Sequence, residues 1–188
     1  MEIKEENILN AYKEGDENVK KLLEGLFPQI EFKGSSIMQR IKTFEDACKE
    51  IGEDSYLYNC YESARLGDDP DLTAFLMLRI IVAALNEGWR PAFGVYEERW
   101  YPCFSLWAEE DLDDKSDEWK TKNNLMPLDN YNTQYKGFTF SRSYSGSIVE
   151  ASVAINHHLY LKNEELADYC GKQFIELWAD YLLPKTPY

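Results

Sequence analysis

The chain has 188 residues and a net charge of −14 at pH 7, with 44% hydrophobic and 29% charged residues. This length suits one domain with a substantial core, and the composition is that of an ordinary globular protein. The strong negative charge argues against a general nucleic-acid binder, because phosphate contacts need clustered Lys and Arg side chains. Two interpretations of the charge remain: a well-solvated surface, or a surface that imitates nucleic acid or docks on a basic partner.

The first ten residues, MEIKEENILN, are polar and lack the apolar segment of a signal peptide. The cysteines form no CxxC pair and have no histidine at zinc spacing; they are Cys48, Cys60, Cys103 and Cys170. We therefore expect a cytoplasmic protein with reduced cysteines, no contact with a membrane, and no bound metal or cofactor.

Apolar residues recur at helical spacing in two segments near the N-terminus, 3–14 and 17–27, which Gly15 and Asp16 separate. The apolar positions are Ile3, Ile8, Leu9 and Tyr12 in the first segment and Val19, Leu22, Leu23, Leu26 and Phe27 in the second. This pattern predicts a helical hairpin. We expect residues 1–40 to be a helical extension that packs on a single domain formed by residues 41–188.

A further helix has recognisable ends. Thr43 is a good N-cap, Asp46 occupies the capping-box position, and Gly52 suits the end of the same helix. The segment 53–68 carries tyrosines among polar residues and gives no clear pattern.

The most apolar stretch begins after Asp69, which suits an N-cap, and Pro70, which suits the first helical position. From Ala74 to Leu85 the only strongly polar residue is Arg79, so the predicted helix is apolar on nearly every face and belongs in a core. We expect Arg79 to pair with a carboxylate or to reach the surface along its aliphatic stem.

The middle of the chain has the pattern of a sheet. Residues 100–107 are strand-like, and Pro102 within them indicates a strand start or an edge strand. Residues 109–118 read as a solvated acidic loop, and residues 119–149 as a long loop followed by a hairpin. In that hairpin the side chains expected on one face are Phe138, Phe140, Arg142 and Tyr144.

The last part of the chain predicts one strand and one long helix. Residues 151–161 alternate as a strand does, and Asn163 caps a helix that continues to Leu182. Gly171 inside this helix indicates close packing against a neighbour. The predicted fold is therefore α+β: a small antiparallel sheet from about residue 100 to 161, packed by the buried central helix and the long C-terminal helix.

Four segments together resemble a family of small proteins found in Bacteroidetes and in their bacteriophages and prophages. They are IKTFEDACKEIG (41–52), ALNEGWRP (84–91), YPCFSLW (101–107) and LKNEELADYCGKQFIELWADYL (161–182), of which the last is the most specific. The family has no established activity, so the resemblance implies no catalytic residues. It implies the context of an intracellular accessory protein of phage or mobile-element origin.

The Tyr-rich segment 131–146 is the strongest candidate for a binding site. Its Tyr, Ser, Asn and Gly residues are typical of adaptable recognition loops, since Tyr offers a large contact area at low entropic cost. The candidate binding residues are Tyr131, Tyr135, Phe138, Arg142 and Tyr144, together with Trp100. The alternative interpretation is that half of these aromatic side chains cover the core.

The acidic run is the second candidate surface, formed by Glu109, Glu110, Asp111, Asp113, Asp114, Asp117 and Glu118. It fails the spacing of an EF-hand calcium loop, because Lys115 stands at the fifth position, where a ligand is needed, and Ser116 stands at the glycine position.

Patterns for catalysis are weaker still. His157 and His158 are adjacent, so on a strand they point to opposite faces and cannot readily chelate one metal. The acids Glu97 and Glu98 are sequence neighbours and therefore do not show the convergence of a glycosidase pair. GxGxxG, GxxxxGK[ST] and HExxH are all absent from the sequence. No catalytic residue is assigned, and an enzyme is the less favoured class.

Three hypotheses follow. The first is a non-enzymatic accessory protein that uses the Tyr-rich segment to bind a partner protein or a small ligand. The second is an acidic decoy that mimics DNA and inhibits a host nucleic-acid enzyme. The third is a small-ligand binder or enzyme with a pocket near Trp89, Trp100 and His157. Direct binding of nucleic acid is expected in none of them.

Overall fold

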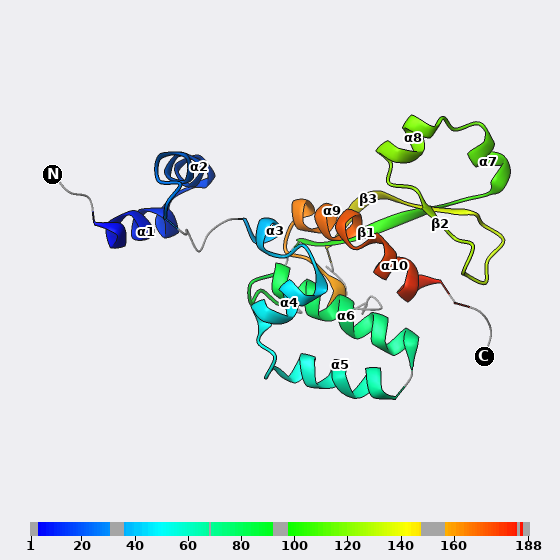
Figure 1. Ribbon diagram of the computed structural model, residues 1–188, viewed down its shortest axis with the longest axis horizontal. Coiled ribbons are helices and arrows are strands. Elements are labelled where there is room, and N and C mark those ends of the chain that lie inside the picture. Colours follow the sequence, from blue (N-terminus) through cyan, green and yellow to red (C-terminus); the bar gives the residue numbers. More distant parts are fainter. Residues whose placement is uncertain are drawn as a thin grey trace. The chain divides into compact units, whose positions relative to one another are not determined.

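The computed structural model describes residues 4–30, 36–67, 69–91, 98–147, 157–183 and 185. It has the α+β architecture that the sequence predicts, with helices and a small antiparallel sheet (Figure 1). The chain forms two compact units, Met1–Arg40 and Ile41–Tyr188. Within the described part of the chain, no helix is long and apolar enough to cross a membrane.

The first unit contains α1 (Glu5–Glu14), α2 (Glu17–Leu26) and α3 (Ile37–Arg40). Ile8 and Tyr12 of α1 are buried, and Leu23 and Phe27 pack against them. The predicted helical pair is therefore present, but its second apolar stripe is narrower than expected, because Val19, Leu22 and Leu26 are exposed. The packing of this unit on the rest of the chain stays a prediction.

The second unit begins with two capped helices. In α4 (Phe44–Ile51) the Thr43 hydroxyl accepts from the backbone N–H of Asp46, and the Asp46 carboxylate accepts from that of Thr43, which is the predicted capping box. Gly52 ends the helix with a φ of +86°. The segment without a clear pattern forms α5 (Tyr56–Leu66), which Ser55 caps.

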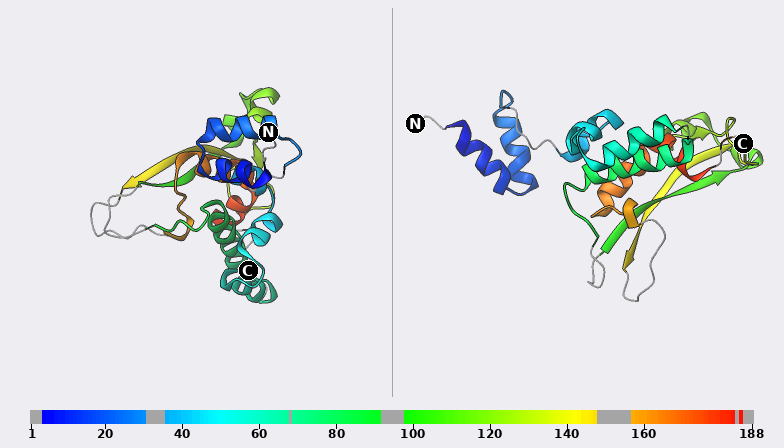
Figure 2. Two further views of the ribbon diagram at one scale, coloured as in Figure 1. Left: turned by 90° about the vertical axis from the view of Figure 1, so that its left-hand side faces the viewer. Right: turned by 90° about the horizontal axis from the view of Figure 1, so that it is seen from below.

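Helix α6 (Pro70–Leu85) is the centre of this unit, as its composition predicts. Asp69 caps it by accepting from the N–H of Leu72 at 2.9 Å. Helices α4 and α5 cover one side of α6, and α10 (Ile175–Leu182) packs on another (Figures 1 and 2). Arg79 is half-buried with its guanidinium carbon 5.7 Å from the centroid of the Phe75 ring, so it leaves the core along its stem.

The sheet contains β1 (Glu98–Trp107), β2 (Met126–Pro127) and β3 (Gly137–Ser147) in the order β1-β3-β2, with both pairs antiparallel. The predicted edge strand is confirmed in β1. Trp100 exchanges two backbone hydrogen bonds with Leu161, at 3.0 and 2.8 Å, on the side of β1 away from β3. The backbone nitrogen of Pro102, two residues later, faces the same side of β1, away from β3. The N–H that proline lacks therefore removes no hydrogen bond between β1 and β3.

A β-bulge at Ser141 changes the face on which the later residues of β3 lie. Cys103 pairs with Arg142 and Phe104 with Phe140, which leaves Ser141 as the extra residue. The prediction that Phe138, Phe140, Arg142 and Tyr144 share one face is therefore wrong, because the last two point away from the first two. The predicted hairpin within 119–149 is instead the short pair of β2 with the start of β3.

One face of the sheet, the inner face, is covered by α9 (Glu164–Gln173), with α10 following it. The predicted single C-terminal helix is two helices, because Phe174 has φ −114° and ψ 34° between them. Gly171 of α9 lies directly on the sheet. A Cβ atom added there would be 2.7 Å from Cβ of Pro102 and 2.5 Å from Cδ2 of Phe140. The predicted close packing at Gly171 is therefore confirmed.

The buried side chain of Asn86, just after α6, holds the segment that leads into α9. Its amide donates to the carbonyl of Tyr160 at 2.8 Å, and its oxygen accepts from the N–H of Lys162 at 3.1 Å. The predicted strand 151–161 is wrong in its described part, since His157–Leu159 forms a 3-10 helix and Leu161 makes only the bridge to Trp100. The Asn86 amide thus forms the hydrogen bonds to the Tyr160 carbonyl and the Lys162 N–H that a neighbouring strand would otherwise form.

Gly171→Ala is expected to lower the free energy of unfolding by about 1–3 kcal/mol, because Pro102 and Phe140 leave no room for the added methyl group. Urea denaturation followed by circular dichroism measures this. Gly25→Ala is the control, since Gly25 lies in α2 with no neighbouring atom within 4 Å of an added Cβ. A gain near 1 kcal/mol for Gly171→Ala, as in an open helix, would contradict the close packing.

Asn86→Leu is expected to cost about 2–4 kcal/mol, since it leaves the buried Tyr160 carbonyl and the partly buried Lys162 N–H without their partner. Asn86→Asp, which keeps the acceptor and loses the donor, should fall between Asn86→Leu and the wild type. Asn59→Leu changes an exposed amide and should stay within about 0.5 kcal/mol of the wild type. Equal stability of Asn86→Leu and wild type would show that the amide does not hold this segment.

Candidate functional site

The outer face of the sheet, opposite α9, carries an exposed group of one arginine and two tyrosines. Tyr101 of β1 pairs directly with Tyr144 of β3, and their ring centroids lie 6.4 Å apart. The guanidinium carbon of Arg142 lies 4.4 Å from the centroid of the Tyr144 ring. Tyr160 supports Tyr101 edge-on at 5.9 Å and is itself buried. Tyr101 and Tyr144 are 37% and 38% exposed, which makes their rings available to a partner.

The structure does not bring the six sequence-predicted binding residues to one surface. Arg142 and Tyr144 belong to the outer face. Phe138 is only 2% exposed and stacks on Phe104 in the core, and strand alternation places the half-buried Trp100 on the same face as Pro102. Tyr131 and Tyr135 lie between β2 and β3, where both are half-buried. The expectation that these residues share a binding surface is therefore wrong for Phe138, to which the alternative interpretation, that part of these rings covers the core, applies.

The acidic run forms two short helices, α7 (Glu109–Asp113) and α8 (Asp117–Lys122), where the sequence predicts a loop. Its seven acidic side chains are all exposed. Lys115 between the helices places its ammonium 5.4 Å from the Trp107 ring and 5.5 Å from the Trp119 ring. Trp107 also donates to the Thr139 hydroxyl at 2.9 Å. These contacts fix the acidic helices on the sheet.

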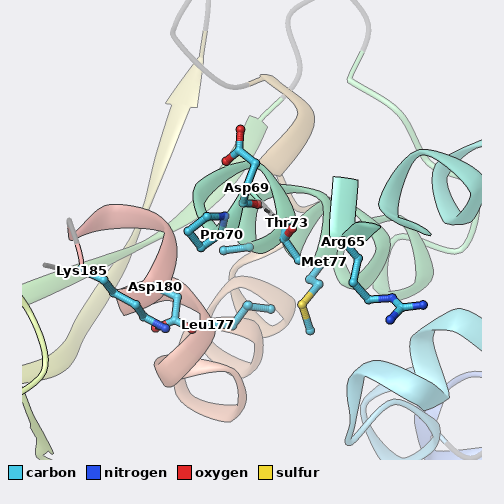
Figure 3. Close-up of a pocket in the computed structure, with 9 residues that line it drawn as sticks. Arg65, Asp69, Pro70, Thr73, Met77, Leu177, Asp180 and Lys185 are labelled. Carbon is cyan, nitrogen blue, oxygen red and sulfur yellow. Dashed lines mark hydrogen bonds and ion pairs between the residues drawn. The ribbon is translucent and has the colours of Figure 1, made fainter. Parts of the chain in front are cut away.

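A pocket of about 270 Å³ lies between α6 and α10 (Figure 3). Its apolar wall is formed by Pro70, Ala74 and Met77 of α6 and by Leu177 of α10. Charged groups stand around this wall, with Asp180 and Lys185 at one end and Arg65 at the other. Asp69 and Thr73 complete the lining.

Asp180 joins the pocket to the Tyr-rich segment. Its Oδ1 atom accepts from the Tyr131 hydroxyl at 2.5 Å and from the Lys185 ammonium at 2.7 Å. Tyr131 and Lys185 also form an isolated β-bridge. Burial, and then the Asp180 carboxylate, raise the pKa of Tyr131 well above its ordinary value. Tyr131 is therefore a hydrogen-bond donor at neutral pH.

The cysteines and the candidate metal ligands are the other groups with potential chemistry in the described ranges. The four cysteines are free thiols. Burial raises the pKa of Cys48 to about 11 and of Cys170 to about 12, so both are poor nucleophiles at neutral pH. Among the described residues, no group of three His, Cys, Asp or Glu side chains is placed to hold a metal ion. Glu97 and the His157 side chain lie outside the described part.

The predicted pocket near Trp89, Trp100 and His157 is a different place from the pocket in Figure 3, which none of these residues lines. Tyr101 is not among the sequence-predicted binding residues, although strand alternation places it on the opposite face from its neighbours Trp100 and Pro102. The residues of the pocket come from four separate segments, and no sequence motif connects them.

Comparison with known proteins gives no relative for this chain. No protein-family model matches it, and neither does any curated protein or any solved structure.

Tyr131→Phe is expected to lower stability by about 1 kcal/mol at pH 8, because the bond to Asp180 is lost. Since the pKa of Tyr131 is raised by folding, its contribution is fully present below the ordinary phenol pKa of about 10 and decreases as the pH rises above it. The stability difference between wild type and variant should therefore shrink above pH 10. Urea denaturation at pH 8, 9, 10 and 11 measures it, and a constant difference would contradict this assignment.

Proposed function

We propose that this chain is a binding protein that holds a carboxylate-bearing segment of a partner protein on the outer face of its sheet. The observation that carries the proposal is the exposed group of Tyr101, Arg142 and Tyr144 on two paired strands. Tyr and Arg are the residue types that most often dominate the binding energy of protein interfaces. The contacts among these three side chains also reduce the entropy lost on binding.

The chemistry of the partner follows from Arg142. Its guanidinium carbon lies over the Tyr144 ring, and its N–H groups donate to none of the residues that the structure describes, so they can bind a planar anion. Strands β1 and β3 carry one acidic residue, Glu98, and strand alternation places it on the other face from Tyr101. A carboxylate beside an aromatic or aliphatic side chain therefore matches this group.

Nucleic acid also presents planar bases and anions, but it fits less well. The net charge of −14 repels a polyanion, and the exposed acids of α7 and α8 are fixed at one end of the same sheet. A single carboxylate on a partner protein meets much less of this repulsion.

The resemblance of the 41–52 and 161–182 segments to proteins of Bacteroidetes and their phages supports a cellular context for the proposal. In that context the chain is an accessory protein of a phage or mobile element, and its partner is a protein of the bacterial host.

A second candidate function is an acidic decoy that occupies the nucleic-acid site of a host enzyme. The exposure of all seven acids of the run favours it. Its partner would be basic, so one experiment distinguishes the two candidates.

The test is selection of peptides from a random display library on the wild-type protein. Enriched peptides are expected to carry Asp or Glu beside an aromatic or aliphatic residue. Their affinity, measured by fluorescence anisotropy, should fall about tenfold or more for Arg142→Gln, which removes a charge-assisted hydrogen bond worth about 1.5–3 kcal/mol. Tyr101→Ala should weaken binding similarly.

The matched control changes Asp111, Asp113, Asp114 and Asp117 to Asn and should leave the affinity of these peptides unchanged or slightly higher. Enrichment of Lys- and Arg-rich peptides that this control variant no longer binds would replace the proposal with the decoy. Tighter binding of a single-stranded oligonucleotide, lost in Arg142→Gln, would replace the protein partner with nucleic acid.

A further inference from the structure

We infer that the pocket between α6 and α10 binds a small neutral molecule with an apolar body and one hydroxyl or amide hydrogen-bond donor. This site is independent of the outer face of the sheet. Its volume of about 270 Å³ is just below the usual range for ligand pockets, about 300–1,000 Å³, so its ligand is smaller than a typical drug.

The apolar body follows from the wall of the pocket. Pro70, Ala74, Met77 and Leu177 present hydrocarbon and thioether surface from two helices. Met77 and Leu177 are each half-buried, so part of their surface is accessible from the pocket. The unbranched Met77 side chain adapts to the shape of a ligand and makes favourable contacts with aromatic rings.

The neutral charge follows from the balance of charges in the lining. Arg65 and Lys185 oppose Asp69 and Asp180, and three of these four are already held by close ion pairs: Lys185 to Asp180 at 2.7 Å, and Arg65 to Glu62 at 2.6 Å. A carboxylate on the ligand would meet Asp180, and an ammonium would meet Lys185. A carboxylate would lose hydration without gaining an unpaired cation, and an ammonium would find Asp180 already paired with Lys185 and Asp69 already engaged as the cap of α6.

The hydrogen-bond donor follows from Asp180. Its Oδ1 atom accepts both the Tyr131 hydroxyl and the Lys185 ammonium, whereas Oδ2 accepts from none of the residues that the structure describes. A carboxylate has about four acceptor positions, so Oδ2 can take an O–H or N–H from a ligand. Because Tyr131 and Lys185 fix the carboxylate, its orientation does not change on binding.

The experiment uses the full chain with ¹³C-labelled methionine methyl groups, of which there are four. Met77 lines the pocket and is the reporter, while Met38 and Met126 lie outside the lining and serve as internal references. The probes share one ring and differ in one group: benzyl alcohol, toluene, benzoate and benzylammonium. Benzyl alcohol is expected to shift the Met77 signal saturably, with an affinity at least fivefold above that of each other probe.

Two variants test the assignment. Asp180→Asn can present an amide N–H where the free oxygen was, so benzyl alcohol should lose its advantage over toluene while toluene still binds. Leu177→Trp should fill the pocket and abolish binding of both, with the Met38 and Met126 signals reporting that the chain is folded. If Leu177→Trp does not fold, Asp180→Asn decides alone. The proposal is overturned if benzyl alcohol leaves Met77 unshifted, binds no better than toluene, or keeps its advantage in Asp180→Asn.

Discussion

The second unit depends on one constraint: α6 is apolar on nearly every face, so every side of it must be covered. Helices α4 and α5 cover it on one side and α10 on another, and the Asn86 amide at its C-terminal end fixes the backbone of Tyr160 and Lys162. Leu161, between those two residues, then bonds to Trp100 at the edge of the sheet. Burial of one helix therefore positions the sheet as well, since its C-terminal end determines where the edge of β1 is held.

A second constraint determines which face of the sheet is free. Helix α9 approaches β1 and β3 so closely at Gly171 that Pro102 and Phe140 occupy the space of a side chain. This contact makes their face the inner one. The bulge at Ser141 then reverses the alternation of β3, which brings Arg142 and Tyr144 to the outer face beside Tyr101. Without the bulge, Arg142 would point toward α9, where a buried guanidinium would need a partner. The position of Tyr101, Arg142 and Tyr144 on the outer face therefore depends on the close contact at Gly171 and on the bulge at Ser141.

The sequence predicts the features that local chemistry determines. The caps at Thr43, Asp69 and Asn163, the core helix α6 and the close approach at Gly171 all follow from residue type and spacing.

The wrong predictions concern segments whose conformation depends on contacts with residues distant in the sequence. Ser141 has no local signal for a bulge, because the bulge depends on how β3 matches β1. The helix break at Phe174 separates a stripe that continues at helical spacing through it. Residues 157–161 alternate as a strand does, yet the Asn86 side chain satisfies their backbone from more than 70 positions away. For the same reason the pocket, built from four separate segments, could not be predicted.

The same interaction between a cation and an aromatic ring occurs at two places on the sheet with different consequences. The Lys115 ammonium lies beside two rings that contact each other, Trp107 and Trp119, so its attraction is directed to its own chain and holds α7 and α8. The Arg142 guanidinium meets one ring, Tyr144, and is exposed. A guanidinium held over one ring still offers several N–H donors to a partner, whereas an ammonium held by two rings of its own chain has fewer directions left. This difference is why the Trp pair has a structural role and the Tyr–Arg group is the better candidate for binding a partner.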